Sequence, residues 1–561
     1  MNVTRQIQMR TLITMANVLL LFACSKVSNK IPENGNAESG FDTALASISR
    51  DNIQSSINYL AADEREGRMT GSRGYNESAQ YVANKFAAMG LEPGGTEEWL
   101  QQVPFITRML DVENSGVTLH KSTGDVDLEW AKDQIIYADR LRTENRIRAE
   151  VVFAGFGVHA PELGYSDFDE IDVSGKIVAM FSGAPATFPS TERAHYSSGR
   201  TKAAELVRRG AIGQIGLMSR LAERLDPWEN WTQNLGTQPG MSWIDESGEV
   251  ADFHPELQGD ATFNRHSAEQ LFEGSSLTFE EALDAADEAR PLSTALDIEV
   301  TMYRRAEHER ITSPNVVGIL RGRDPELTNE YVVYSTHLDH LGTGAPVDGD
   351  SIYNGLYDNA LGVAVTIEIA RTFASLSVPP RRSIVFVAVT GEEEKLAGSD
   401  YFAHYPTVPS SAIVANVNID MPMFLFPMNT VTGYGAEHSS LEGLTTEEAR
   451  KEGFEYILDP FPDQVYFIRS DQYSFVRQGI PSVYLAEGIG SSDPAVDGRA
   501  VLDAFFAEHY HQPSDDLSQP IEWETALRFS RAGARIGYRI AMEDQRPTWN
   551  EGDFFGEKFG H

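Results

Sequence analysis

Five apolar runs between residues 313 and 488 constrain the fold of this 561-residue chain more than any other feature. They read SPNVVGILRG, EYVVYSTHLDH, RSIVFVAVTGEE, SAIVANVNIDM and IPSVYLAEG. Short runs rich in β-branched residues and without polar alternation are typical of strands that are buried on both faces. Between the second and third runs, NALGVAVTIEIARTFASL has the apolar spacing of a helix. Strands that alternate with helices predict an α/β domain with a mixed, largely parallel sheet sandwiched by helices.

Side chains that can bind metals follow these runs one after another. In parallel sheets, ligands bind at the carboxyl ends of the strands, where such side chains meet. Imidazole and carboxylate together suit zinc, and a set of this size can hold two ions that share a bridging carboxylate. Manganese or cobalt could occupy the same set. The residues in these positions are His337, Asp339, Asp358, Glu392, Glu393, Asp420 and His511.

Seven stretches of the chain resemble one known family, the co-catalytic di-zinc aminopeptidases. The motifs HLDHLG, GLYDNALGV, TGEEEKLAGS, NIDM and YHQPSDD follow the order of the family's motifs. The stretches LAADEREGRMTGSRG and RPTWNEGDFFGEKF, on either side of them, fit the family as well. This resemblance implies a zinc-exopeptidase fold, two Zn²⁺ per chain and peptide substrates with a free N-terminus.

The same resemblance implies a distribution of metal ligands. His337 and Asp420 would hold one zinc, Glu393 and His511 would hold the other, and Asp358 would bridge the two. Asp339 would orient His337 or the bridging carboxylate.

The resemblance further implies which residues take part in the chemistry. Glu392, next to a ligand but not one itself, would be the general base. Tyr510 would donate a hydrogen bond to the oxyanion of the substrate. Glu394 is expected to be solvated and without a role. Asp471, in the stretch RSDQYSFVRQGIPSVY, would support the site or contact the substrate.

Three positions depart from the family's pattern. Tyr357 replaces an acidic residue that does not bridge the metals, and Leu361 replaces a small polar residue. Gln472 stands where the family has histidine. Because Asp358 is present, we expect the metals to bind and the departures to affect specificity more than activity.

Residues 111–305 have a different sequence pattern, in which short β-rich runs alternate with Gly and Asp turns. AEVVFAGFGVHAPELGYSDFDEIDVSGKIVAMFSG resembles the protease-associated (PA) domain, a β-rich module inserted in several peptidase families. We therefore expect a discontinuous peptidase domain, residues 41–110 and 306–561, with a PA domain inserted at 111–305. The insert is expected to be either a lid over the substrate or a spacer.

The N-terminus has the pattern of an export signal. Residues 1–23 combine Arg5 and Arg10 with a short apolar run, as a signal peptide does. The sole cysteine, Cys24, follows LFA and resembles the lipidated cysteine of bacterial lipoproteins, with residues 24–40 as a polar tether. The sequence thus predicts an exported protein of the cell envelope, anchored by lipid to the outer membrane. An ordinary signal peptide with an incidental thiol is the alternative.

Acidic side chains outnumber basic ones by 83 to 46, so the net charge is −37. Such a surface repels nucleic acid and argues against a protein that binds phosphate backbones. The sequence indicates no oligomeric state, and any membrane contact would be through the lipid anchor alone.

Two other functions remain open at this level. A metal-free relative could act as a binding protein, although the five ligands and Glu392 are all present. A carboxypeptidase or a glutaminyl cyclase could use the same fold. Carboxypeptidase relatives bind the substrate carboxylate with arginines, and no arginine cluster is identifiable in the sequence.

Overall fold

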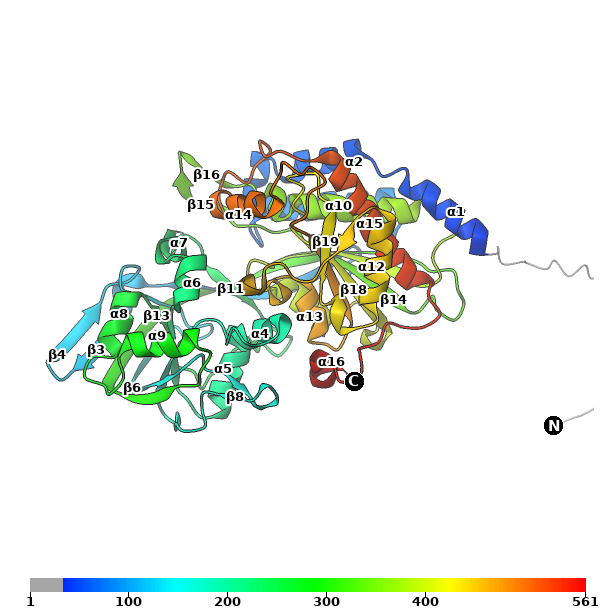
Figure 1. The fold of residues 1–561 in the computed structure, drawn as a ribbon. Coiled ribbons are helices and arrows are strands. Elements are labelled where there is room, and N and C mark those ends of the chain that lie inside the picture. Colours follow the sequence, from blue (N-terminus) through cyan, green and yellow to red (C-terminus); the bar gives the residue numbers. More distant parts are fainter. Residues whose placement is uncertain (1–33, 234, 561) are drawn as a thin grey trace, which may run out of the picture.

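The computed structural model describes residues 34–233 and 235–560, which form two sheets joined by one long strand (Figure 1). Cys24, the predicted signal peptide and residues 24–33 of the predicted tether lie outside the described residues. The description begins with helix α1 (Asn34–Leu45).

The first sheet is mixed and has a parallel centre. Strands β17, β14, β18 and β21 lie next to one another in this order and all run parallel, whereas β13 and β19 flank them antiparallel. This arrangement confirms the predicted fold class. The strands of this sheet are β1 (Glu92–Pro93), β2 (Leu100–Leu110), β11 (Gly240–Trp243), β13 (Ser293–Leu320), β14 (Tyr331–His337), β17 (Ser383–Val389), β18 (Ile413–Ile419), β19 (Thr430–Tyr434), β20 (Glu455–Tyr456) and β21 (Ser482–Glu487).

Helices cover both faces of this sheet, and the side chains of its strands alternate between them. Val332 and Tyr334 of β14 pack in the core beneath one layer of helices, while Val333 packs in the core on the opposite face. Burial on both faces explains why the strands read as continuous apolar runs. The first layer contains α2 (Arg50–Leu60), α3 (Arg73–Ala88), α10 (Leu361–Ala374) and α15 (Trp523–Met542), and the second contains α11 (Ala397–His404) and α13 (Gln472–Val476). Around them lie α12 (Leu441–Lys451), α14 (Gly498–Glu508) and α16 (Phe554–Phe559).

The segment 111–305, here called the insert segment, forms most of the second sheet and has a hydrophobic core of its own. Its strands are β3 (Gly116–Lys121), β4 (Gly124–Leu128), β5 (Gln134–Ile136), β6 (Glu144–Ala154), β9 (Ile177–Phe181), β10 (Gly213–Leu217) and β12 (Gly259–Phe263). Its helices are α4 (Ser190–Ser197), α5 (Gly199–Arg208), α6 (Arg220–Leu225), α7 (Trp228–Gln233), α8 (Arg265–Leu271) and α9 (Phe279–Asp287). Two further sheets have only two short strands each. β7 (His159–Ala160) pairs with β8 (Tyr165–Ser166) in the insert segment, and β15 (Gly342–Val347) pairs with β16 (Asp350–Tyr353) outside it. The domain boundaries and the PA resemblance stay predictions.

Strand β13 connects the two sheets because its two halves pair with different partners. Residues 293–305 pair with β6, and residues 306–316 pair with β2. The sequence run SPNVVGILRG is therefore only the end of a 28-residue strand. Strand β11 of the insert segment pairs with β2, so the insert segment also extends the first sheet.

Helix α4 of the insert segment packs against the C-terminal helix α16. His195 of α4 is 3% exposed, and its ring contacts those of Phe554 and Phe555. Its Nδ1 lies 2.7 Å from the Tyr473 hydroxyl. Burial lowers the pKa of His195 to about 3, and the nearby Lys558 ammonium acts in the same direction.

This burial predicts a loss of stability in acid. Between pH 6.5 and 3 the unfolded chain protonates His195 while the folded chain does not, so stability falls as the pH falls through this window. The expected loss from this residue is about 1.4 kcal/mol per pH unit, or roughly 3 kcal/mol at pH 4.5 relative to pH 7. Urea unfolding at both pH values would measure it. In His195→Gln the pH dependence should be smaller by this amount, and an unchanged dependence would contradict the prediction.

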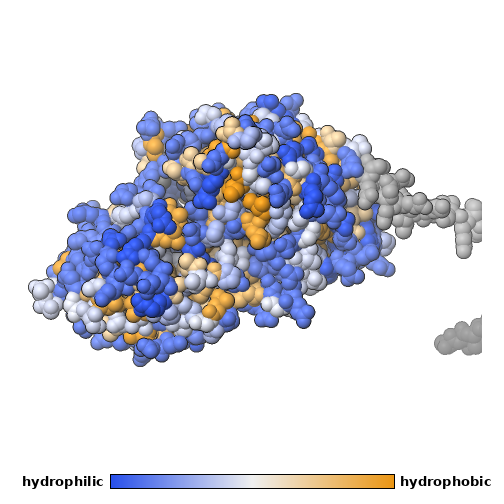
Figure 2. Space-filling model, viewed as in Figure 1, coloured by the Kyte–Doolittle hydropathy of each residue, from blue (hydrophilic) through white to orange (hydrophobic). Residues whose placement is uncertain are grey.

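Hydrophilic residues cover most of the face shown in Figure 2, and apolar residues form small separate patches. Among the described residues, no helix combines the length and the apolar character that crossing a membrane requires.

Candidate metal centre

The predicted ligands converge where the parallel strands end. His337 ends β14 and is in register with Val389, the last residue of β17. Glu392 and Glu393 follow β17 in the next loop, and Asp420 directly follows β18. Because these strands are parallel neighbours, their carboxyl ends meet at one edge of the sheet.

One group of ligands surrounds His337. Its Nε2 lies 2.9 Å from Asp420 Oδ1 and 3.1 Å from Asp358 Oδ1. Its Nδ1 lies 3.1 Å from the main-chain oxygen of Asp339, which suits a proton on Nδ1 and leaves Nε2 free for a metal. One donor atom from each of His337, Asp358 and Asp420 lies within 4.8 Å of the others.

A second group surrounds Glu393 and shares Asp358 with the first. His511 Nε2 lies 3.2 Å from Asp358 Oδ2 and 3.3 Å from Glu393 Oε2. The sequence did not single out His340 as a ligand, yet its Nδ1 lies 2.7 Å from Glu393 Oε1. One donor atom from each of His340, Asp358 and Glu393 lies within 4.8 Å of the others. The structure thus brings all five predicted ligands together and adds a histidine.

The donor set fits zinc. It combines imidazole nitrogens with buried carboxylate oxygens, the ligands that zinc prefers together with thiolates. His511 Nε2 is buried and makes no hydrogen bond within the described part of the chain, although two carboxylates lie near it. Several buried carboxylates in one place repel one another unless a cation lies between them. These residues therefore suit metal ions with Asp358 shared between two groups.

Two acidic residues hold the loops that carry the ligands. Asp339 is fully buried, and its carboxylate accepts the N–H groups of Glu392 (3.1 Å) and Glu393 (3.3 Å). Its side chain thus orients the Glu392–Glu393 turn, and its main-chain oxygen lies 3.1 Å from His337 Nδ1. The Asp515 carboxylate accepts the N–H of Asp358 at 3.1 Å, and burial raises the pKa of Asp515 to about 6. Asp515 belongs to the motif YHQPSDD, but sequence reasoning assigned it no role.

Arg68, which sequence reasoning also missed, ties together the loops on either side of His337 and Asp358. It is fully buried, and its guanidinium donates to four main-chain oxygens. These belong to Leu338 (3.0 Å), Leu60 (2.7 Å), Asn354 (2.6 Å) and Gly355 (2.9 Å). Its only signal in the sequence was its place in the Gly- and Arg-rich loop EREGRMTGSRG.

Arg68→Met is expected to lower the free energy of unfolding by about 3–5 kcal/mol, because it leaves several buried carbonyl groups without donors. It should also weaken metal binding, since the loops carrying His337 and Asp358 lose their shared anchor. Urea unfolding and metal titration would measure the two effects. Arg73→Met is the matched control, because Arg73 is exposed and forms ion pairs with the surface residues Glu66 and Glu77. Equal stability of the two variants would refute the role of Arg68.

Gln472, the departure from the family's histidine, is connected to the ligand Asp420 through a chain of hydrogen bonds. Asn418 Nδ2 donates to Gln472 Oε1 (3.2 Å) and to Ser470 Oγ (2.7 Å), and Ser470 Oγ donates to Asp420 Oδ2 (2.5 Å). Asp471 is fully buried beside this chain, and burial raises its pKa to about 7. Neither side chain lines the cavities at the metal centre.

The other departures are structural. Tyr357 is buried. Its hydroxyl donates a hydrogen bond to the main-chain oxygen of Pro520 (2.6 Å), and its ring packs on Phe505. Leu361 is also buried in the core, at the first turn of α10.

The three adjacent glutamates have different surroundings. Glu392 lines both cavities at the metal centre but belongs to neither ligand group. The sequence had suggested that Glu394 is solvated and without a role, and this prediction is wrong. Its carboxylate accepts the N–H of Met241 in β11 (2.7 Å), and burial raises the pKa of Glu394 to about 7. The reason is that β11, from the insert segment, lies against the loop that carries Glu394.

Tyr510 lies beside the centre as predicted. Its ring stacks on His511 with centroids 3.8 Å apart, and its hydroxyl accepts a hydrogen bond from Arg469 (3.1 Å). Burial raises the pKa of Tyr510 well above its usual value, so the phenol keeps its proton at neutral pH.

Two cavities border the centre. The smaller, of about 40 Å³ and here called the small aromatic cavity, is lined by aromatic and charged side chains, and the larger, of about 490 Å³, lies between the loop 392–397 and the insert segment. The smaller is lined by His337, Asp358, Glu392, Asp420, Met421, Tyr434, Tyr466, Arg469, Ser470, Tyr484, Glu487, Phe506 and Tyr510. Residues 197–200, Trp243 and Asp260 of the insert segment line the larger cavity.

Known proteins share this fold and parts of this sequence. Residues 315–536 match the family model described as Peptidase family M28. The chain is 34% identical over 143 residues to a protein of Pyrenophora teres f. teres described as "Probable zinc metalloprotease", covering 25% of this chain and 29% of that protein. It is 24% identical over 242 residues to "Aminopeptidase Y" of Saccharomyces cerevisiae, covering 42% of this chain and 40% of that protein.

Among solved structures, the aminopeptidase from Aneurinibacillus sp. strain AM-1 has the same fold. The TM-score is 0.52 at 18% identity, over 90% of this chain and 97% of that chain. The chain spans less than a third of the length of the first curated relatives that it matches, between 16% and 31%.

The match to Peptidase family M28 covers the part of the chain that carries the candidate ligands. Residues 315–536 contain His337, Asp358, Glu393, Asp420 and His511, and the likeness to this family is over that part.

Proposed function

We propose that this protein is a zinc-dependent aminopeptidase that removes single residues from the N-terminus of peptides. The observation that carries the proposal is the convergence of two ligand groups on Asp358, with Glu392 beside them but in neither group. A peptidase needs a carboxylate that is free to move protons next to the metals, and Glu392 has that position.

The small aromatic cavity supports cleavage at a chain end. Its volume of about 40 Å³ suits one side chain rather than an extended peptide. Glu487 lies in its wall, 6% exposed, with Oε2 lacking a donor among the described residues. An unpaired buried carboxylate oxygen favours an ammonium group. We therefore assign this cavity to the N-terminal residue and its α-amine.

We assign two zinc ions to the two ligand groups, with His337 and Asp420 on one side, Glu393 and His511 on the other, and Asp358 shared. Zinc bound there would supply a water of lowered pKa and a positive charge close to the scissile carbonyl. Manganese or cobalt would fit the same ligands.

The chain's own residues would act in sequence around that site. Glu392 would accept the proton of the attacking water and deliver it to the leaving amine. Tyr510, protonated and held by Arg469, would donate a hydrogen bond to the oxygen of the scissile carbonyl as negative charge develops there. His511 would hold the Tyr510 ring in place by stacking.

We further propose, from the N-terminal sequence alone, that the protein is exported and anchored by lipid at Cys24 to the outer membrane. Detection of a lipid-modified N-terminal cysteine by mass spectrometry of the membrane fraction would test this. A soluble mature protein that begins after residue 23 without lipid would refute it.

The proposed activity is tested with two substrates that differ in one group. Leucyl-p-nitroanilide should be hydrolysed at least about 100-fold faster than its N-acetyl twin, because acetylation removes the charged amine and its contacts. A chelator should stop the reaction, and zinc should restore it. Comparable hydrolysis of both substrates would refute the aminopeptidase.

A carboxypeptidase is the second candidate, because basic side chains of the insert segment line a cavity near the centre. Release of glycine from N-acetyl-leucyl-glycine, without cleavage of leucyl-p-nitroanilide, would establish it instead.

A further inference from the structure

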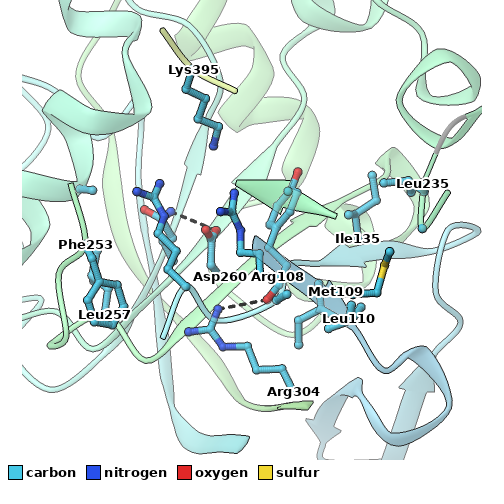
Figure 3. Close-up of a pocket in the computed structure, with 18 of the residues that line it drawn as sticks. Arg108, Met109, Leu110, Ile135, Leu235, Phe253, Leu257, Asp260, Arg304 and Lys395 are labelled. Atoms are coloured by element: carbon cyan, nitrogen blue, oxygen red, sulfur yellow. Dashed lines mark hydrogen bonds between the residues drawn. The ribbon is translucent and has the colours of Figure 1, made fainter. Parts of the chain in front are cut away.

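A third cavity continues from the larger one into the insert segment (Figure 3). It has a volume of about 270 Å³ and shares Arg140, Asp260 and Lys395 with the larger cavity at the metal centre. Lys395 belongs to the loop that carries Glu392 and Glu393. The two cavities therefore share part of their walls, between the metal centre and the insert segment.

Basic side chains from distant parts of the chain converge on this space. Figure 3 shows the guanidinium of Arg108 and the ammonium of Lys395 turned into the cavity, with Arg304 on the far side. Arg304 is already paired with Asp139 at 2.8 Å. Within the described part of the chain, no carboxylate forms an ion pair with Arg108, Arg140 or Lys395.

Their remaining contacts leave donors available. Arg108 donates to Ser242 Oγ at 3.1 Å, and Arg140 Nη1 donates to the main-chain oxygens of Ala251 (3.0 Å) and Asp252 (3.2 Å). Asp260, which also lines the cavity, accepts a hydrogen bond from Gln214 at 3.0 Å.

This accumulation is unfavourable without a ligand. Arg108 and Arg140 are half-buried, and burial lowers the pKa of Arg108 to about 10, while Glu394 acts against this shift and the Arg140 cation adds to it. The chain has a net charge of −37, yet none of the described carboxylates forms an ion pair with these three cations. Cations that line a cavity without an ion-pair partner favour an anion there.

We propose that Arg108, Arg140 and Lys395 bind the free C-terminal carboxylate of short peptide substrates. The inference rests on the proposed aminopeptidase function, which places the N-terminal residue in the small aromatic cavity and the rest of the peptide in the open space. Lys395 is two residues from Glu393, so their Cα atoms are at most about 7 Å apart. The distance to be covered is this separation plus the length of the lysine side chain. An extended peptide covers it with about two to four residues. Tripeptides and tetrapeptides are thus the substrate class that the cavity suits.

The test compares peptides that differ only at the C-terminus. For the metal-replete full chain, kcat/KM for Leu-Gly-Gly should exceed that for Leu-Gly-Gly-amide at least tenfold, mainly through a lower KM. Arg108→Met and Lys395→Met should each bring this acid-to-amide ratio close to one, whereas Arg108→Lys should keep part of it. Arg148→Met is the control, because Arg148 is an exposed residue of the insert segment that pairs with Glu299. It should leave the ratio unchanged.

Three outcomes would overturn the proposal. Acid and amide could be cleaved equally at every peptide length. The ratio could survive in Arg108→Met and Lys395→Met. Leu-Gly-Glu-amide could match Leu-Gly-Gly, which would show that the site binds an acidic side chain instead of the chain terminus.

A binding measurement separates this proposal from the proposed function. Calorimetric titration of Glu392→Gln with Leu-Gly-Gly and with its amide should give at least a tenfold difference in Kd, which Arg108→Met introduced into the same variant should remove. If the wild type cleaves neither peptide but the difference in Kd holds, the aminopeptidase is refuted and the carboxylate site stands. Equal Kd values would refute the carboxylate site whatever the activity.

Discussion

Glu392→Gln is expected to lower kcat for leucyl-p-nitroanilide about 10²–10⁴-fold, the usual contribution of a general base. Glutamine has nearly the same shape but cannot accept the proton of the attacking water. Metal content should stay unchanged, because the Glu392 side chain belongs to neither ligand group. Steady-state kinetics with metal analysis by mass spectrometry would measure both quantities.

Two comparisons make this result interpretable. Glu326→Gln is the matched control, since Glu326 is exposed in a loop of the same sheet region and lines none of the cavities at the centre. A loss of zinc in Glu392→Gln would mean that Glu392 is a ligand. Full activity with zinc bound would mean that another group moves the proton.

Asp358→Ala is expected to empty both metal positions and to abolish turnover. The two carboxylate oxygens of Asp358 face different groups, with Oδ1 3.1 Å from His337 Nε2 and Oδ2 3.2 Å from His511 Nε2. Loss of an outer partner of a metal ligand weakens binding about 10–100-fold. Loss of a shared ligand should therefore exceed that range at both positions. Equilibrium dialysis against zinc would show the change in stoichiometry and affinity.

A graded series gives the control for this experiment. Asp515→Asn, which weakens the support of the Asp358 main chain, should reduce zinc affinity without emptying the site. Asp348→Asn changes an exposed loop residue and should have no effect. If Asp358→Ala kept one tightly bound zinc, the shared role of Asp358 would be wrong.

The strand pattern and the ligand positions could be predicted because both depend on short stretches of chain. β14, β17 and β18 are buried strands of seven residues each; His337 ends β14, and Glu393 and Asp420 follow β17 and β18 directly or within a short loop. Parallel neighbours end at the same edge, so local patterns sufficed to place these side chains together. The type of ligand then indicated zinc.

The surroundings of the centre could not be predicted in the same way. The role of Arg68 depends on contacts with Asn354 and Gly355, which are more than 280 residues away in sequence. His340 and Glu393 are 53 residues apart, so no local pattern placed the two side chains in contact. Glu394 was expected to be solvated, because nothing in its own stretch indicates that Met241 of β11 lies against it.

By itself, the sequence determined the α/β class and placed the five predicted ligands after successive apolar runs, because hydrophobic periodicity and strand termini are local properties of the chain. Only the tertiary structure decided which loops Arg68 and Asp515 hold, where His340 points, and that Arg108, Arg140 and Lys395 meet in one cavity. These contacts depend on sheet pairing, above all on β13 and β11, which bring the insert segment against the metal centre. Such pairing joins segments that lie far apart in the sequence, and no local pattern encodes it.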